Sequence, residues 1–232
     1  MLRWLAVVCL SIAVSPAWAQ YRHYSVGDND AAMPTRLVMI PARVKVHEMS
    51  AAGMLELVPD WTREASEQLT QAVDRFVQQR RAPRLVPLPE LTEDERDQLD
   101  DYLATLMVVA GDAFFVVNRG GDAWSHKRER FDYSVGEGLE FLARKSGADG
   151  AMLIIGNDIV SSAGRKAIFI MGALAGVAIP MGSSAVYGAF VDLKTGNLLW
   201  INNVASGVRD LRDPAGAAAM IDSLLHRLPP TP

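Results

Sequence analysis

Strand-type and helix-type patterns alternate along this chain, and this alternation restricts its fold more than any other feature. The strand patterns are β-branched or apolar runs bounded by turn residues. The last two runs are joined by Lys194-Thr195-Gly196-Asn197, a turn in which glycine adopts a positive φ at low cost. The run at 84–88 lies between prolines, so we expect it at a sheet edge. Strands are predicted at residues 36–46, 53–58, 84–88, 151–160, 186–193 and 198–204.

Two helices are predicted in the first half of the chain by apolar residues that repeat with a period near 3.6. Asp60 is the expected cap of the first helix. Thr92 and Glu95 form a capping box at the start of the second. This second helix is expected to continue through residues 113–117, although that stretch is also compatible with a strand.

Two more helices are predicted in the second half. Ser134 and Glu137 form a capping box for a helix that ends at Gly147. Asp213 caps the final helix, and Pro214 occupies its first position. The residues expected to face the core from this helix are Ala217, Ile221, Leu224, Leu225 and Leu228.

The order of these elements predicts an α/β fold, a single domain with a mixed β-sheet flanked by helices. We expect this domain at residues 36–228, with an apolar Gly/Ala-rich insertion at 161–185. A polar segment at 20–35 precedes it and is expected to form a flexible N-terminal arm.

The first nineteen residues have the pattern of a secretory signal peptide. Arg3 supplies the positive charge, residues 4–14 are apolar, and Ala17-Trp18-Ala19 is a cleavage box. Cleavage after Ala19 would place the mature protein in the bacterial periplasm.

Composition excludes several classes of function. Removing Arg3 with the signal leaves 22 basic and 27 acidic residues, and such an acidic chain has no strong attraction to nucleic acid. Cys9 is the only cysteine and lies in the signal, so the mature chain would have no disulfide or thiolate ligand. Cys9 could instead carry a lipid, but Val8 stands before it where a small residue is expected.

No catalytic, cofactor-binding or metal-binding residue is assigned, and no cofactor is expected. The four histidines are far apart in the sequence, and none has a partner at the spacing of a zinc site. Asp158 ends an apolar strand, where it either leaves the sheet for solvent or acts as a catalytic acid. A hydrolase using Asp158 or an acid within residues 93–101 is therefore an alternative function.

Residues 167–181 form a stretch of fifteen residues without a charge, which is the first candidate interaction segment. It is shorter than the roughly 20 residues that span a bilayer. One interpretation is a core helix between two strands, and the other is a surface element that docks on a membrane or a partner. Gly172 and Gly176 give it a small-xxx-small face. The candidate contact residues are Ile168, Phe169, Gly172, Leu174 and Gly176.

The second candidate segment is a loop within residues 119–133, in which an aromatic residue stands among positive charges. Trp124, Lys127, Arg128 and Arg130 suit an anionic ligand or the rim of a protein interface. The alternative is a solvated loop with Trp124 folded back onto the core.

The second half of the chain resembles a group of periplasmic α/β domains. The residues that carry this resemblance are GADGA at 147–151, which leads into an apolar strand, and GAFVDLKTGNLLW at 188–200. The group includes the curli-secretion lipoprotein CsgG and the penicillin-binding-protein activator LpoB. The resemblance implies a non-enzymatic domain that serves envelope assembly, secretion or cell-wall regulation. This chain departs from the group in lacking a convincing lipid-attachment motif and alternating pore-forming hairpins.

These observations lead to the prediction of a periplasmic, non-enzymatic accessory or binding protein of the cell envelope that acts through protein contacts. Its expected partners are envelope proteins of unknown identity, with peripheral membrane contact as a possibility and no nucleic acid. A self-assembling envelope subunit that packs through residues 167–181 is a further alternative.

Overall fold

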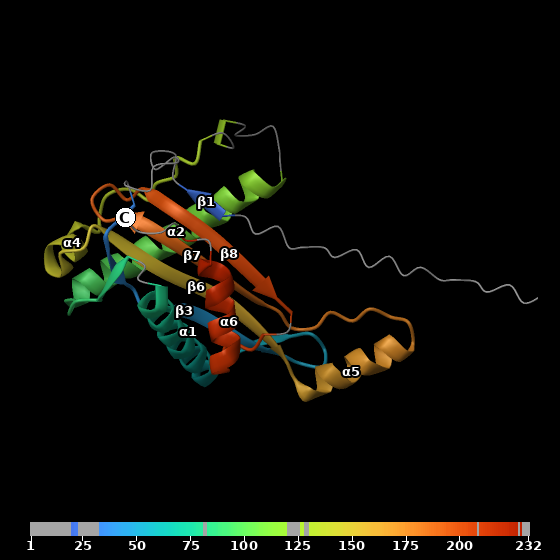
Figure 1. Ribbon diagram of the computed structural model, residues 1–232. Coiled ribbons are helices and arrows are strands. Elements are labelled where there is room, and N and C mark those ends of the chain that lie inside the picture. Colours follow the sequence, from blue (N-terminus) through green and yellow to red (C-terminus); the bar gives the residue numbers. More distant parts are fainter. Residues whose placement is uncertain are drawn as a thin grey trace, which may run out of the picture.

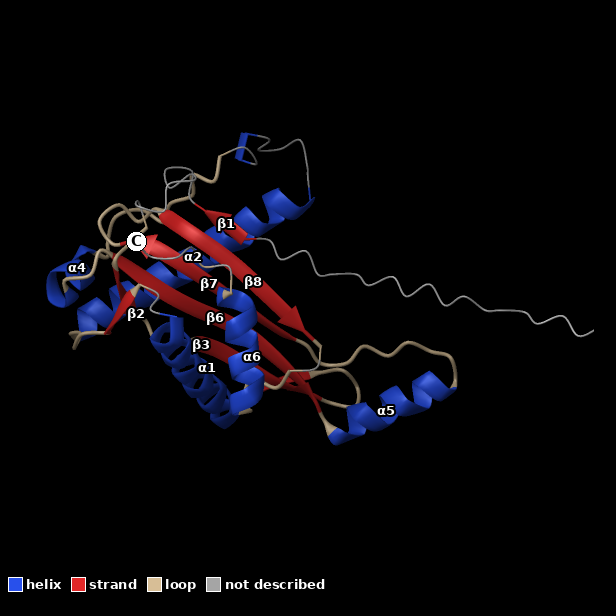
Figure 2. Ribbon diagram, in the orientation of Figure 1, coloured by secondary structure: helices blue, strands red, loops and turns tan. Residues whose placement is uncertain are grey.

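The computed structural model describes residues 20–22, 33–80, 83–119, 126–127, 130–207, 209–226 and 228. Its centre is an eight-stranded mixed sheet with helices on both faces, as the alternating patterns predicted (Figures 1 and 2). The strands are β1 (Gln20–Arg22), β2 (Arg36–Met39), β3 (Arg43–Met49), β4 (Leu55–Leu57), β5 (Arg84–Pro87), β6 (Gly150–Ser161), β7 (Ser184–Asp192) and β8 (Leu198–Ser206). The helices are α1 (Pro59–Arg80), α2 (Glu93–Arg119), α4 (Glu140–Ser146), α5 (Ala163–Leu174) and α6 (Pro214–Leu225).

Strand β6 organises the sheet. It pairs antiparallel with β7 on one side, and β7 continues antiparallel to β8 and then β1. On its other side β6 pairs in parallel first with β2 and then with β3. β2 in turn pairs in parallel with β5, and β3 pairs antiparallel with β4. The proline-flanked run at 84–88 is thus an edge strand, as predicted.

The core consists of two apolar layers, one on each face of the sheet. Successive residues of β6 point to opposite faces, so Met152 contributes to one layer and Leu153 to the other. Helices α1 and α6 cover the first layer, and α2 with α4 cover the second. Because both faces of β6 are covered, its first half is a continuous apolar run rather than an alternating one.

The single strand predicted at 36–46 is wrong, because β2 and β3 are separate strands. The break spans residues 40–42 and contains Pro41, which has no N–H to donate to a neighbouring strand. Beyond the break, helix α1 covers the edge of β3. The hydroxyl oxygens of Thr62 and Thr70 accept hydrogen bonds from the N–H groups of Val46 and Ala42, both at 3.0 Å.

The predicted helix ends have mixed outcomes. The Thr92–Glu95 capping box is confirmed in both directions, at 3.2 and 2.8 Å. Residues 113–117 belong to α2, so the strand interpretation of that stretch is wrong. Helix α1 begins at Pro59 and includes Asp60 in its first turn, so the prediction that Asp60 is the cap of this helix is wrong.

The second predicted capping box is also wrong. Helix α4 begins at Glu140, and its N-cap residue Leu139 makes no side-chain cap. Ser134 instead forms a bridge to Asn197, which draws the segment before α4 against the β7–β8 turn. The predicted end of this helix at Gly147 is confirmed, with φ +64°.

The last part of the chain follows the prediction closely. The hairpin of β7 and β8 is present, and Asp213 caps α6 by accepting a hydrogen bond from the Gly216 N–H at 2.9 Å. The predicted core-facing residues of α6 are buried, and Leu228 is partly buried against the same layer. At the other terminus, the expected signal peptide and residues 23–32 of the expected arm lie outside the described residues, while Gln20–Arg22 form β1.

Candidate functional site

The Gly/Ala-rich insertion leaves the sheet between β6 and β7 and extends away from the body of the protein (Figure 1). We call residues 162–183 the apolar projection. It contains α5 and a segment without regular structure that returns to β7, which we call the return segment (175–183). No residue of α5 is buried, so the interpretation of this stretch as a core helix is wrong.

Polar contacts hold the base of the projection together. Ser162 caps α5 by accepting a hydrogen bond from the Arg165 N–H at 3.2 Å. The guanidinium of Arg165 donates to the carbonyl oxygen of Pro180 through Nε at 3.0 Å and Nη2 at 2.9 Å. Its Nη1 also reaches the carbonyl oxygen of Ala51, in the turn after β3, at 3.4 Å. Arg165 therefore joins the helix, the return segment and the sheet.

The two glycines of the predicted small-xxx-small face have structural roles within the projection. A Cβ atom on Gly172 would lie 2.5 Å from Cγ1 of Ile179, so the return segment packs directly against this glycine. Gly176 has φ +72° and ends the helix. The N–H groups of Gly176 and Val177 donate to the carbonyl oxygens of Ala173 and Gly172, at 3.2 and 2.7 Å, which is a Schellman motif.

The apolar side chains of α5 are exposed around the whole helix. Ile168, Phe169, Ile170 and Met171 are consecutive, so at about 100° per residue they point to four different sides. Their exposed fractions are 40%, 38%, 58% and 67%, and that of Leu174 is 80%. The two lower values belong to Ile168 and Phe169. These residues flank the side of the helix on which Gly172 faces the return segment.

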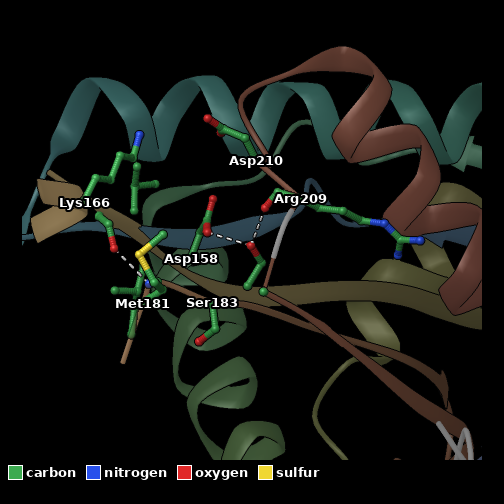
Figure 3. Close-up of a pocket in the computed structure, with 12 residues that line it drawn as sticks. Asp158, Lys166, Met181, Ser183, Arg209 and Asp210 are labelled. Atoms are coloured by element: carbon green, nitrogen blue, oxygen red, sulfur yellow. Dashed lines mark hydrogen bonds between the residues drawn. The ribbon is translucent and has the colours of Figure 1, made fainter. Parts of the chain in front are cut away.

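A cleft of about 160 Å³ lies at the base of the projection (Figure 3). It lies among the end of β6, the start of α5, the start of β7 and the segment after β8. Lys166 and Asp210 line it at the surface, and Asp158 lies at its inner end. The carboxylate of Asp210 is paired with the guanidinium of Arg212 at 2.6 Å, which lowers the pKa of Asp210.

Asp158 is buried, so the expectation that it leaves the sheet for solvent is wrong. Its Oδ1 lies 2.7 Å from Ser184 Oγ, and its Oδ2 accepts a hydrogen bond from the Leu211 N–H at 3.3 Å. Ser184 Oγ also lies 2.7 Å from the carbonyl oxygen of Arg209. A hydroxyl group has only one proton to donate, so a second proton is needed to satisfy both contacts. Burial raises the pKa of Asp158, which favours the protonated acid that supplies this proton.

The surroundings of Asp158 favour a structural role. Both carboxyl oxygens are engaged by Ser184 and Leu211, which attaches the segment before α6 to the end of β6. Acids of the 93–101 stretch also make contacts within the chain. Glu95 pairs with Lys145, and Asp100 pairs with Arg43 at 2.6 Å.

The second candidate segment lies far from the projection. Trp124 and Arg128 fall outside the described residues. Lys127 is engaged within the chain, since its Nζ pairs with Asp132 at 2.6 Å and lies 5.0 Å from the centre of the Tyr133 ring. Arg130 is exposed. The bridge from Ser134 to Asn197 places this region at the β7–β8 turn, whereas the projection joins β7 at its other end.

The apolar stretch was predictable from the sequence, but the polar residues at its base were not among the predicted site residues. Ser162 could have been recognised, because a serine between an apolar strand and a helix is a common cap. Ser184 and Arg209 gave no such signal, since their contacts with Asp158 and with each other join positions far apart in the chain.

Neither a membrane-spanning helix nor a metal-binding cluster occurs in the part of the chain that the structure describes. None of its helices combines the length and apolar character needed to cross a membrane. No three His, Cys, Asp or Glu side chains within the described ranges lie close enough to hold a metal ion together.

Comparison of the sequence with models of known protein families gives no match, and comparison with curated proteins gives none either.

Proposed function

We propose that this protein is a non-enzymatic accessory protein of the bacterial cell envelope that works by binding, with the apolar projection as its binding element. The exposure of four consecutive large apolar residues on α5 carries this proposal. Soluble proteins rarely leave a large contiguous apolar patch bare unless it has a partner. No residue of α5 is buried, so a contribution to the stability of the fold does not explain why these side chains are apolar.

Two further observations support this proposal over the alternatives. The signal-like pattern of residues 1–19 favours a role outside the cytoplasm, where the envelope supplies apolar partners. Asp158, the acid named for the hydrolase alternative, is buried with both oxygens engaged, an arrangement that favours a structural carboxyl group.

Cell fractionation tests the proposal. The full chain, expressed in a Gram-negative bacterium, is expected to sediment with envelope membranes, and Leu174→Glu is expected to move it to the soluble periplasmic fraction. Val108→Glu is the matched control, because Val108 is a similarly exposed apolar residue on α2 (67% exposed) away from the projection. Equal distribution of wild type and both variants would contradict the proposal.

A further inference from the structure

We infer that the partner of the apolar projection is a lipid bilayer, and that the tip of the projection enters the boundary between headgroups and acyl chains. This inference rests on the proposed function and names the partner of the same element. The distribution of apolar side chains, the hydrogen bonds of the tip and the position of charge support it.

Helix α5 is apolar on all sides. A helix that docks in a protein groove, or pairs with a second copy, needs only one apolar stripe and keeps a polar face for solvent. Ile168, Phe169, Ile170 and Met171 instead point in four directions, and none of them is buried. A medium that is apolar on every side satisfies such a helix, and the acyl region of a bilayer is such a medium.

The backbone at the tip of the projection pairs its N–H groups internally. Lipid offers no hydrogen bonds, so an element that enters it must satisfy its own N–H and C=O groups. The Schellman motif does this for the N–H groups at the end of α5, where those of Ala175, Gly176 and Val177 all donate to carbonyl oxygens within the helix. At the end of the helix that lies farthest from the sheet, these three N–H groups therefore need no water (Figure 2).

Charge is confined to the base of the projection. Its only charged residues are Arg165 and Lys166, both in the first turn of α5, and Lys166 is exposed beside the cleft. Leu174 is the eighth residue after Lys166, which corresponds to about 12 Å along a helix. Interfacial helices bury their apolar side chains about 5–10 Å below the headgroups. With the tip inserted, Lys166 would lie at the level of anionic phosphates, which attract basic side chains.

Vesicle sedimentation tests this inference. The protein, purified as secreted, is mixed with vesicles of phosphatidylethanolamine and phosphatidylglycerol, or of phosphatidylcholine alone. We expect the wild type to sediment with vesicles, and more strongly with the anionic mixture. Ile170→Glu and Leu174→Glu should each weaken binding about tenfold or more, because a carboxylate is costly to insert among acyl chains. Val108→Glu should bind like the wild type.

A probe at the tip gives a second readout. Cys9 is the only cysteine of the chain and lies in the expected signal peptide, so Ala175→Cys gives a single labelling position in the processed protein. A polarity-sensitive fluorophore there should shift to shorter wavelength when anionic vesicles are added. An unshifted spectrum with bound protein would place the contact elsewhere and overturn the inference.

The outcomes separate this inference from the proposed function. If the wild type sediments with envelope membranes but not with pure lipid vesicles, the lipid inference is overturned while the binding role stands. Concentration-dependent self-association that Leu174→Glu abolishes, without vesicle binding, would identify a second copy as the partner and also overturn it. If wild type and Val108→Glu bind vesicles and the two projection variants do not, the inference is supported.

Discussion

Ser184 and Asp158 lie on adjacent strands with Oγ and Oδ1 2.7 Å apart, and the carbonyl oxygen of Arg209 lies equally close to the same hydroxyl group. The hydroxyl group has one proton for two acceptors. A neutral Asp158 resolves the competition, because its own O–H donates to Ser184 and Ser184 then donates to Arg209. The segment that leads from β8 to α6 is thus held at a buried carboxyl group whose pKa is raised by burial, which favours this neutral arrangement.

The first prediction is that Asp158 makes the protein less stable as the pH rises. Its pKa is raised in the folded state, mainly by burial, so the folded protein binds this proton more tightly than the unfolded chain. The free energy of unfolding should therefore fall as the pH rises from the ordinary pKa of an aspartate through the raised value. Asp158→Asn retains a donor for Ser184 and an acceptor for Leu211 without the titration. Thermal melts between pH 4 and 8 should show the variant gaining stability relative to the wild type as the pH rises.

Asp158→Ala is the control for this prediction, because it removes the hydrogen bonds as well as the titration. It should be less stable than Asp158→Asn at every pH. A stability difference between wild type and Asp158→Asn that does not change with pH would show that Asp158 does not titrate in this way.

The second prediction concerns Trp200, which is fully buried in the core layer covered by α1 and α6. Its ring packs against that of Phe190, with the ring centres 4.9 Å apart. Trp200→Ala should lower the free energy of unfolding by about 3–5 kcal/mol, because removal of a large buried ring leaves a cavity. Denaturant melts measure this loss.

Trp200→Phe is the graded control. The indole Nε1 is buried and has no hydrogen-bond partner among the described residues, so phenylalanine keeps an aromatic ring and removes an unsatisfied donor. It should cost clearly less than Trp200→Ala. A loss below about 1 kcal/mol for the alanine variant would contradict the packing of this side chain.

The third prediction separates the projection from the core. Gly172→Leu would place a Cβ atom 2.5 Å from Ile179 Cγ1 and 3.1 Å from the carbonyl oxygen of Val177, so the return segment must move. Limited proteolysis should cut residues 172–181 faster in this variant. The free energy of unfolding of the whole domain should change by less than about 1 kcal/mol, since α5 contributes nothing to the core layers. A larger loss would show that the projection packs on the domain.

The fourth prediction concerns secretion. The cleavage box Ala17-Trp18-Ala19 should be cut in a bacterium that recognises such signals, so that protein recovered from the periplasm begins at Gln20. N-terminal sequencing checks this, and mass spectrometry of the same sample excludes or detects a lipid. A lipid-modified product that begins at Cys9 would contradict both the cleavage position and the expectation that the mature protein carries no lipid.

Elements whose signals are local could be predicted from the amino-acid sequence alone. Asp213 and Pro214 predict the start of α6, and the apolar run before Asp158 predicts β6, because caps and periodicity act over a few residues. The absence of charge in residues 167–181 was sufficient to find the candidate interaction segment, but not to decide its place. The periodicity of a sequence shows which side chains are apolar, but it does not show which other helices or strands cover them.

Features that depend on contacts between distant positions of the chain could not be predicted and are seen only in the folded protein. Asp158 is buried because Ser184 and the segment around Leu211 fold over the end of β6. Gly172 serves the return segment, because Ile179 occupies the space where a side chain would lie. α5 is exposed because α1 and α6 already cover one face of the sheet and α2 and α4 the other, so no apolar layer remains for it to join. Whether a side chain is buried depends on how all the elements pack together, and this packing leaves the projection exposed at the surface.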